Sequence, residues 1–281
     1  MTPKNTLVFI HIPKTAGSTL HSILPNYYDH NYYVDGLHVI RDLETFKKLT
    51  PEERNNFDVV RGHFTHELLP LIENKITLTY LRDPVDRFLS AYFYLKQATW
   101  SPYHETVKNM NHIDEFITFS KNMGRDNVQT RHLAGDISHF LDSNVTPTDF
   151  ATEGDRLLNT AKENLNSIDF VFLTKQFDAS LLILKKELGW NKLPVYKVQN
   201  KTKARKKVSE IEPDTLQKIK ELNKQDVALF EAAKIQNETL MKQYDLTEEL
   251  ASFLSKNRAF QAKKKSVVSS MFRKVKKKLG N

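Results

Sequence analysis

A short turn near the start of the chain carries the residues best suited to bind an anion. It lies in the segment LVFIHIPKTAGSTLHSIL (7–24), between an apolar run that predicts a strand over 7–12 and a stretch that predicts a helix from residue 17. The first N–H groups of a helix have no internal partners, and small residues let a phosphate approach them. Lys14 adds a mobile positive charge. The predicted phosphate-binding residues are Lys14, Thr15, Ala16, Gly17, Ser18 and Thr19.

A second segment, YLRDPVDRFLSAY (80–92), pairs a basic residue with a hydroxyl. Arg82 lies at the end of a predicted strand, and Ser90 follows eight residues later, about two turns into the next helix. Both side chains can reach one phosphate, and a guanidinium suits that group because it offers several coplanar donors. The alternative is a capped helix in which Arg82 pairs with a neighbouring aspartate.

The order of residues in the first turn distinguishes two classes of nucleotide-binding loop. The common nucleoside triphosphate loop reads G-x-x-x-x-G-K-[ST], whereas Lys14 precedes its turn and the upstream glycine is missing. The order P-K-T-x-G-[ST]-T instead resembles the 5′-phosphosulfate loop of sulfotransferases, which use 3′-phosphoadenosine 5′-phosphosulfate (PAPS). The second segment resembles the 3′-phosphate-binding motif of the same enzymes, which implies that Arg82 and Ser90 hold that phosphate.

The resemblance continues to about residue 235 and is to the glycan branch of the family, the heparan sulfate 2-O- and 6-O-type enzymes. RGHFTHELL (61–69) resembles the segment that carries their catalytic histidine, which implies that His63 is the base. His66 and Glu67 are the alternatives for this role, and His11 is expected to pack under the loop as a structural donor. NVQTRHLAG (127–135) resembles a segment near the nucleotide and acceptor.

Gln129 and Arg131 are the candidates for contact in that last segment, although a helix start at the surface is an equal alternative. Arg87 is a further basic residue of the second segment, and a position on the helix surface or an intramolecular ion pair explains it equally well. The basic loop 200–207 either contacts the nucleotide or is solvated.

The inferred reaction resembles phosphoryl transfer, with the acceptor oxygen, the sulfur and the leaving oxygen in line. Lys14 would stabilise the leaving oxygen, and His63 would take the proton of the acceptor hydroxyl near neutral pH. The acceptor is expected to be a carbohydrate or glycolipid. A P-loop nucleotide or small-molecule kinase and a non-catalytic nucleotide-binding module are the two alternatives.

The elements around these segments predict the fold class. Apolar runs at 57–61, 76–81 and 168–174 join the first strand, and helical patterns cover 84–95, 111–121, 155–166, 178–188 and 213–243. Alternating strands and helices indicate an α/β, P-loop-like fold of three layers, with a mostly parallel sheet between helices. We expect a single domain over 1–255.

The net charge of +8 over 281 residues is concentrated at the C-terminus. Residues 256–281 contain ten Lys or Arg and no acidic residue, which leaves 32 basic and 34 acidic side chains in 1–255. A body so close to neutral argues against nucleic acid as a partner. Helical spacing of apolar residues in 263–281 predicts an amphipathic helix that associates with anionic membrane, or else a solvated end.

Several features of the sequence bear on metal binding and on cellular location. The chain has no cysteine, so disulfides and thiolate metal sites are excluded. The histidines lack ligand spacing with carboxylates, so no metal is expected. The start of the chain does not resemble a signal peptide, and no apolar run is long enough to span a membrane. We therefore expect a cytoplasmic protein that can associate peripherally with the inner membrane surface through its tail. The absence of an anchor and of cysteines also suggests a bacterial or other cytoplasmic relative of the glycan enzymes.

Overall fold

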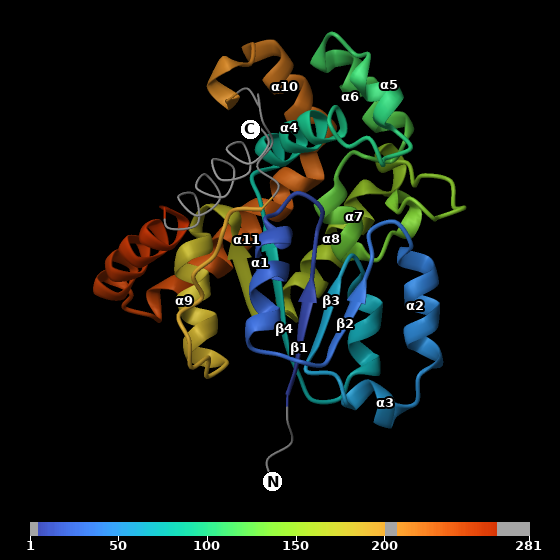
Figure 1. Ribbon diagram of the computed structural model, residues 1–281. Coiled ribbons are helices and arrows are strands. Elements are labelled where there is room, and N and C mark those ends of the chain that lie inside the picture. Colours follow the sequence, from blue (N-terminus) through green and yellow to red (C-terminus); the bar gives the residue numbers. More distant parts are fainter. Residues whose placement is uncertain (1–4, 200–206, 263–281) are drawn as a thin grey trace, which may run out of the picture.

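The computed structural model describes residues 5–199 and 207–262 (Figure 1). Its central sheet has the strand order β2-β3-β1-β4-β5, and every pair in it is parallel. The strands are β1 (Thr6–Ile10), β2 (Asn31–Val34), β3 (Val59–Gly62), β4 (Lys75–Leu81) and β5 (Phe170–Leu173). Helices cover both faces, which confirms the predicted α/β fold with a parallel sheet.

Helices connect the strands and close the molecule at its ends. They are α1 (Gly17–Ile23), α2 (Val39–Lys48), α3 (Pro51–Asn55), α4 (Pro84–Leu95), α5 (His104–Lys108), α6 (Ile113–Asn122), α7 (Val128–Ala134), α8 (Phe150–Asn166), α9 (Phe177–Glu187), α10 (Pro213–Leu222) and α11 (Lys224–Lys242). Short 3₁₀ turns are η1 (Leu24–Asn26), η2 (His66–Leu71), η3 (Ile137–His139), η4 (Thr174–Gln176) and η5 (Val208–Glu210).

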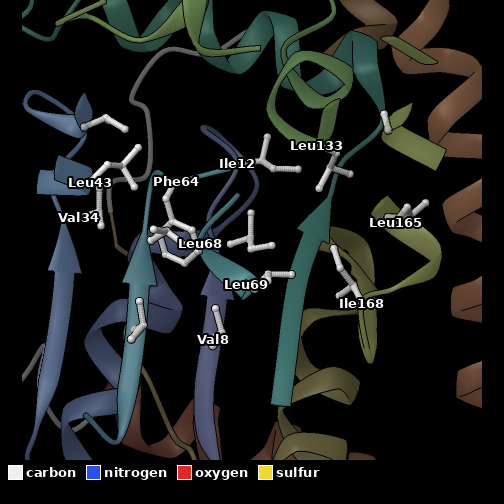
Figure 2. Packing of buried hydrophobic residues seen from close by; sticks show 14 of the residues in the cluster. Val8, Ile12, Val34, Leu43, Phe64, Leu68, Leu69, Leu133, Leu165 and Ile168 are labelled. Carbon is white, nitrogen blue, oxygen red and sulfur yellow. The ribbon is translucent and has the colours of Figure 1, made fainter. Parts of the chain in front are cut away.

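Strand β1 packs against helices on both faces of the sheet. All five of its residues are buried, as expected for a parallel strand covered on both faces. Side chains alternate along a strand, so Leu7 and Phe9 pack on one face with α1 and α9. Val8 and Ile10 pack on the other face with α2, α8 and α11. Figure 2 shows part of this second cluster, which fills the space between the sheet and its covering helices.

A third apolar cluster lies beyond the carboxyl ends of the strands. It joins α4 to α6 and α10 through residues such as Phe88, Phe116 and Ile219. In Figure 1 these helices gather at the end toward which the strand arrows point. This cluster fixes α4 above the sheet edge, and the N-terminus of α4 is capped by Asp83, whose side chain accepts from the Asp86 N–H at 2.9 Å.

Two elements differ from the sequence-based expectation. Strand β2 was not predicted, because it is a four-residue edge strand that is only partly buried and pairs with β3 alone. The stretch 213–243 forms two helices in place of one long helix. The break is at Asn223, whose buried side chain accepts a hydrogen bond from the Asn127 N–H at 3.0 Å. Helical propensity alone does not reveal such a tertiary contact.

The C-terminal part of the described chain belongs to the body. A helix over 247–262 passes through the predicted domain boundary at 255, with Phe253 and Asn257 buried. The Asn257 side chain accepts from the Tyr196 N–H at 2.9 Å. The body therefore extends to residue 262 at least, while the predicted amphipathic helix at 263–281 lies outside the described residues. Within the described ranges, no helix is both long and apolar enough to cross a membrane.

Candidate functional site

A cavity of about 940 Å³ opens at the carboxyl ends of the strands. Its lining comes from the β1–α1 loop, the β2–α2 connection, the end of β3 and one face of α4. Ligands of open parallel sheets bind at this edge, beside the point where strand order reverses. Here β1 is that point, because β3 lies on one side of it and β4 on the other.

The β1–α1 loop has the backbone of an anion-binding turn. Lys14 and Ala16 adopt left-handed conformations, with φ of 74° and 70°. Turns of this kind direct successive N–H groups to one side. Of the six predicted phosphate-binding residues, Lys14, Ala16, Gly17, Ser18 and Thr19 line the cavity. Thr15 does not line it, since its buried hydroxyl donates to the Ile12 carbonyl at 2.8 Å and holds the turn.

Gly17 is required by the residue that lies under the loop. A Cβ at this position would lie 2.0 Å from the His11 ring, so any larger residue would displace the histidine. His11 thus packs beneath the loop, as expected, and its Nδ1 lies 2.9 Å from Nε2 of His21. Burial lowers the pKa of His11 well below its ordinary value, and His63 and His21 lower it further. A neutral imidazole therefore supports the loop.

Arg82 joins the two predicted motifs. Its Nη1 donates to the Lys14 carbonyl at 3.0 Å, and its Nε donates to Asp86 Oδ2 at 2.6 Å. Arg82, Asp86 and Ser90 all line the cavity. The ion pair that sequence analysis gave as an alternative is thus present, but it holds Arg82 at the cavity wall.

Gln129 lies behind the wall. Its side chain is buried, and it clamps the backbone of Arg82: Oε1 accepts from the Arg82 N–H and Nε2 donates to the Arg82 carbonyl, both at 2.9 Å. Gln129 does not line the cavity. Its geometry gives it the role of positioning Arg82, in place of the direct contact expected from sequence.

Arg131 also lies away from the cavity. The side chain is 1% exposed and forms ion pairs with Asp126 at 2.8 Å and Asp136 at 2.6 Å. Its Nη2 donates in addition to the Thr148 carbonyl at 2.9 Å. These partners occupy the guanidinium of Arg131. The expected contact between Arg131 and a ligand is therefore wrong, and the residue has a structural role.

Two further arginines supply positive charge to the cavity. Arg87 is buried at the wall, with its Nε 3.9 Å from Asp226 Oδ2, and its Nε and Nη2 have no hydrogen-bond partner within the described part of the chain. Arg125 was not predicted, because it precedes α7 in a segment with no local motif. It lines the same cavity, with its guanidinium 4.8 Å from the centre of the Tyr103 ring.

The basic loop predicted to approach the nucleotide is described only at its edges. Residues 200–206 lie outside the described ranges, whereas Gln199 and Lys207 line the cavity. The Gln199 N–H donates to the Thr19 hydroxyl at 3.3 Å, so the chain entering this loop lies against α1.

His63 follows β3 at a close approach of two strands. Gly62 has a φ of 137°, and a Cβ there would lie 2.2 Å from the Val34 carbonyl oxygen, so only glycine fits. The His63 N–H donates to the same carbonyl at 3.3 Å. Its ring lies against the His11 ring, with centroids 4.2 Å apart and planes 32° apart. Gly36 also lies against the His63 ring, since a Cβ at this position would be 2.8 Å from it.

Burial keeps the His63 imidazole in the unprotonated form that a base requires. Burial lowers the pKa of His63 to about 4, while a hydrogen bond to the His11 backbone and the charge of Asp35 oppose this shift. The imidazole is therefore neutral at pH 7 and able to accept a proton.

The two alternatives to His63 do not line the cavity. His66 Nε2 lies 2.7 Å from the Ser167 hydroxyl. Glu67 is exposed, with its Oε2 3.7 Å from the Nζ of Lys47. The geometry thus favours His63 among the three candidates.

Aromatic side chains surround the mouth of the cavity. Tyr33 is 44% exposed and Trp100 is 53% exposed, and both line it. Tyr94 lies below Lys14, whose Nζ is 3.4 Å from the ring centroid. Sequence reasoning missed these residues because they come from separate elements and share no motif. Among the described residues, no group of three or more histidines and carboxylates is arranged to hold a metal ion.

Comparison with known proteins adds independent findings. A family model described as the sulfotransferase family matches residues 1–231. Heparan-sulfate 6-O-sulfotransferase 2 of Danio rerio is 28% identical over 215 residues, covering 69% of this chain and 45% of the relative. Heparan-sulfate 6-O-sulfotransferase 1 of Homo sapiens is 29% identical over 179 residues, covering 56% of this chain and 42% of the relative. The chain thus spans less than half the length of these relatives.

A solved structure shows a weaker likeness. It is the crystal structure of mouse sulfotransferase SULT7A1 complexed with PAP, with a TM-score of 0.40 and 13% sequence identity. The alignment covers 78% of this chain and 64% of that chain.

Proposed function

Because the chain belongs to the sulfotransferase family, we propose that it transfers the sulfuryl group of PAPS to a hydroxyl of a carbohydrate acceptor. The products are the sulfated acceptor and 3′,5′-adenosine bisphosphate (PAP). The single observation that carries this proposal is the meeting of three groups in one cavity. They are the β1–α1 loop, the Arg82–Ser90 pair and the neutral imidazole of His63.

In this proposal the nucleotide occupies the β1 and β4 side of the cavity. The amides of Gly17, Ser18 and Thr19 bind the 5′-phosphosulfate, with Lys14 near the bridging oxygen. Arg82 and Ser90 bind the 3′-phosphate, and the guanidinium groups of Arg87 and Arg125 add to the positive field there.

The acceptor then reacts from the His63 side. The acceptor oxygen attacks sulfur and forms a new S–O bond, while the S–O bond to the 5′-phosphate breaks. His63 takes the proton of the hydroxyl, and the leaving phosphate oxygen keeps the electron pair of the broken bond. Lys14 and the loop amides stabilise the charge that builds on this oxygen.

The acceptor class rests on the matched relatives, which are named as heparan-sulfate 6-O-sulfotransferases. Those names support a carbohydrate. A glycolipid acceptor, association with anionic membrane through the tail and a cytoplasmic location stay predictions from the sequence.

The two alternative functions have less support. A P-loop kinase is disfavoured by the family match and by the missing G-x-x-x-x-G-K-[ST] order. A non-catalytic nucleotide-binding module leaves the neutral His63 beside the anion loop without a role.

The test is thermal stability with PAP, compared with ADP and with ATP plus Mg²⁺. A ligand at one hundred times its dissociation constant stabilises a protein by about 2.7 kcal/mol. We expect this shift with PAP alone, and its loss in Lys14→Ala and Arg82→Ala. Arg156→Ala removes an exposed arginine that pairs with Glu153 on α8, and it is the control. A Mg²⁺-dependent shift with ATP, and none with PAP, would favour the kinase.

A further inference from the structure

The β2–α2 connection forms a second wall of the cavity, beside His63. Asp35, Gly36 and Leu37 line this wall, together with Tyr33 at the end of β2. In the sheet, β2 and β3 lie on one side of β1. Strand β4, which leads to Arg82, lies on the other side. An acceptor that reaches His63 therefore meets this wall, on the side of β1 away from the Arg82–Ser90 pair.

Asp35 is held in a fixed position on that wall. Its Oδ1 accepts from the Leu37 N–H at 2.6 Å, and its own N–H donates to Asp42 Oδ2 at 2.9 Å. Val34, just before it, accepts the His63 N–H, which ties the connection to the end of β3. The local turn thus orients the carboxylate without engaging a cation, since Asp35 forms no ion pair within the described residues.

Charge is distributed unequally over the cavity lining. The cations are Lys14 on the β1–α1 loop, Arg82 and Arg87 beyond β4, Arg125 before α7, and Lys207 before η5. Of the two carboxylates, Asp86 is paired with Arg82. Asp35 is the other, and its field reaches the His63 ring, whose pKa it raises.

The remaining groups near this wall do not reverse its charge. His11, His21, His63 and His139 line the cavity, and burial lowers the pKa of each, so all four are neutral at pH 7. Arg61 is the nearest cation in sequence to His63. It lies over the Tyr33 ring at 5.0 Å and does not line the cavity. Among the described lining residues that the β2 and β3 ends contribute, Asp35 carries the formal charge, while the charges of Lys14 and Arg125 reach the His63 and His139 rings from other elements.

We propose that Asp35 determines acceptor specificity, by accepting a hydrogen bond from a hydroxyl of an uncharged sugar and repelling a carboxylate or sulfate at that place. The inference rests on the proposed sulfuryl transfer and deepens it, because it names an uncharged carbohydrate as the acceptor class, in contrast to the anionic heparan sulfate for which the matched relatives are named. An ionised carboxylate accepts hydrogen bonds only, and these are stronger than neutral ones. A like charge at this wall is unfavourable in a partly buried setting.

The experiment compares uncharged and acidic acceptors of equal length. Transfer from ³⁵S-labelled PAPS is measured as kcat/KM with chitotetraose and maltotetraose, and with a hyaluronan tetrasaccharide, which carries carboxylates. We expect the wild type to favour an uncharged acceptor by about tenfold or more, or about 1.4 kcal/mol. Asp35→Asn keeps an acceptor for the Leu37 N–H and should lower the ratio of kcat/KM for the uncharged acceptor to kcat/KM for hyaluronan. Asp35→Lys should bring this ratio below one.

Asp155→Asn, which removes an exposed carboxylate on α8, is the charge-matched control and should leave the ratio unchanged. A wild-type preference for hyaluronan, a ratio insensitive to Asp35→Asn, or no transfer to either uncharged acceptor would overturn this inference. PAP titrations of the same preparations separate it from the proposed function. If PAP fails to stabilise the wild type, the sulfotransferase proposal itself is contradicted.

Discussion

The two sides of β1 are built in different ways. On the β4 side, the proposed anion-binding groups come from two continuous segments, and Arg82 connects them directly through the Lys14 carbonyl and Asp86. On the β2–β3 side, the wall is assembled from the ends of two strands, the His63 ring and the segment that contains His139. One side is rich in cations, whereas the other combines neutral histidines, the exposed Tyr33 ring and a carboxylate.

This difference separates what each side is able to recognise. Cations and turn amides bind phosphate groups through charge and short hydrogen bonds, whatever else the ligand contains. Aromatic rings, neutral imidazoles and one carboxylate distinguish ligands by shape and by the sign of their charge. We therefore expect changes on the β4 side to alter PAP affinity and changes on the β2–β3 side to alter turnover and acceptor choice.

The largest effect is expected from His63→Gln. Without a base for the acceptor hydroxyl, kcat should fall about 100- to 10,000-fold, while the dissociation constant of PAP stays nearly unchanged. Steady-state transfer from PAPS and PAP calorimetry measure the two quantities. His66→Gln is the matched control, since His66 contacts Ser167 outside the cavity, and a comparable loss of kcat in that variant would refute the assignment of the base.

Replacing Lys14 with Met should lower kcat by about 100- to 1,000-fold, because the charge on the leaving oxygen then loses one preorganised donor. Met keeps most of the aliphatic stem and removes the ammonium group. PAP affinity should also weaken, which sets this variant apart from His63→Gln. Lys48→Met, on α2, is the control. A full kcat in Lys14→Met would show that the loop amides act without the lysine.

The histidine cluster predicts how the free energy of unfolding depends on pH. His63 has a pKa of about 4 in the folded protein, against about 6.5 for an unfolded histidine. Both states are neutral above about pH 6.5, so stability is constant there. As pH falls from 6.5 toward 4, the unfolded state binds a proton that the folded state does not, and stability falls.

His63 alone should remove about 1 to 2 kcal/mol between pH 6.5 and pH 5, and the other buried histidines act in the same direction. Urea unfolding at pH 7.5, 6.5 and 5 measures this. The slope should be shallower in His63→Gln, and stability that stays constant or rises down to pH 5 would contradict neutral burial.

The smallest effect concerns the contact between Lys14 and Tyr94. A cation over an aromatic face is stabilised by about 0.5 to 1 kcal/mol at a partly exposed site. Lys14 must leave this ring to reach a phosphosulfate, so Tyr94→Leu should tighten PAP binding about two- to fivefold. Tyr94→Phe keeps the ring face and should bind PAP like the wild type. Weaker binding in Tyr94→Leu alone would instead make the ring part of the nucleotide site.

The loop at 13–19 and the capped helix after Arg82 were predictable because strand–turn–helix chemistry is local. The types and order of residues at 13–19 and 82–90 are enough to propose a loop and a capped helix. The resemblance added His63, and it lies in the same cavity. The parallel sheet followed from alternating apolar runs, although the short edge strand β2 did not.

The roles of Gln129 and Arg131 were not predictable in the same way. Their burial depends on partners that the fold brings together, such as the Arg82 backbone for Gln129 and Asp126 and Asp136 for Arg131. Asp35 and Arg125 illustrate the opposite case, since isolated charged residues without a motif become cavity residues only through packing. Local patterns therefore identify the proposed phosphate side, whereas the proposed acceptor side is assembled by tertiary structure.

The division between the two sides is tested most directly by calorimetric titration of PAP into the wild type, Arg82→Ala and His63→Gln. We predict that Arg82→Ala weakens binding by about tenfold or more, since hydrogen bonds to charged groups contribute about 1.5 to 3 kcal/mol. His63→Gln should bind PAP like the wild type. Equal weakening in both variants, or unchanged binding in Arg82→Ala, would contradict a cavity with separate nucleotide and acceptor sides.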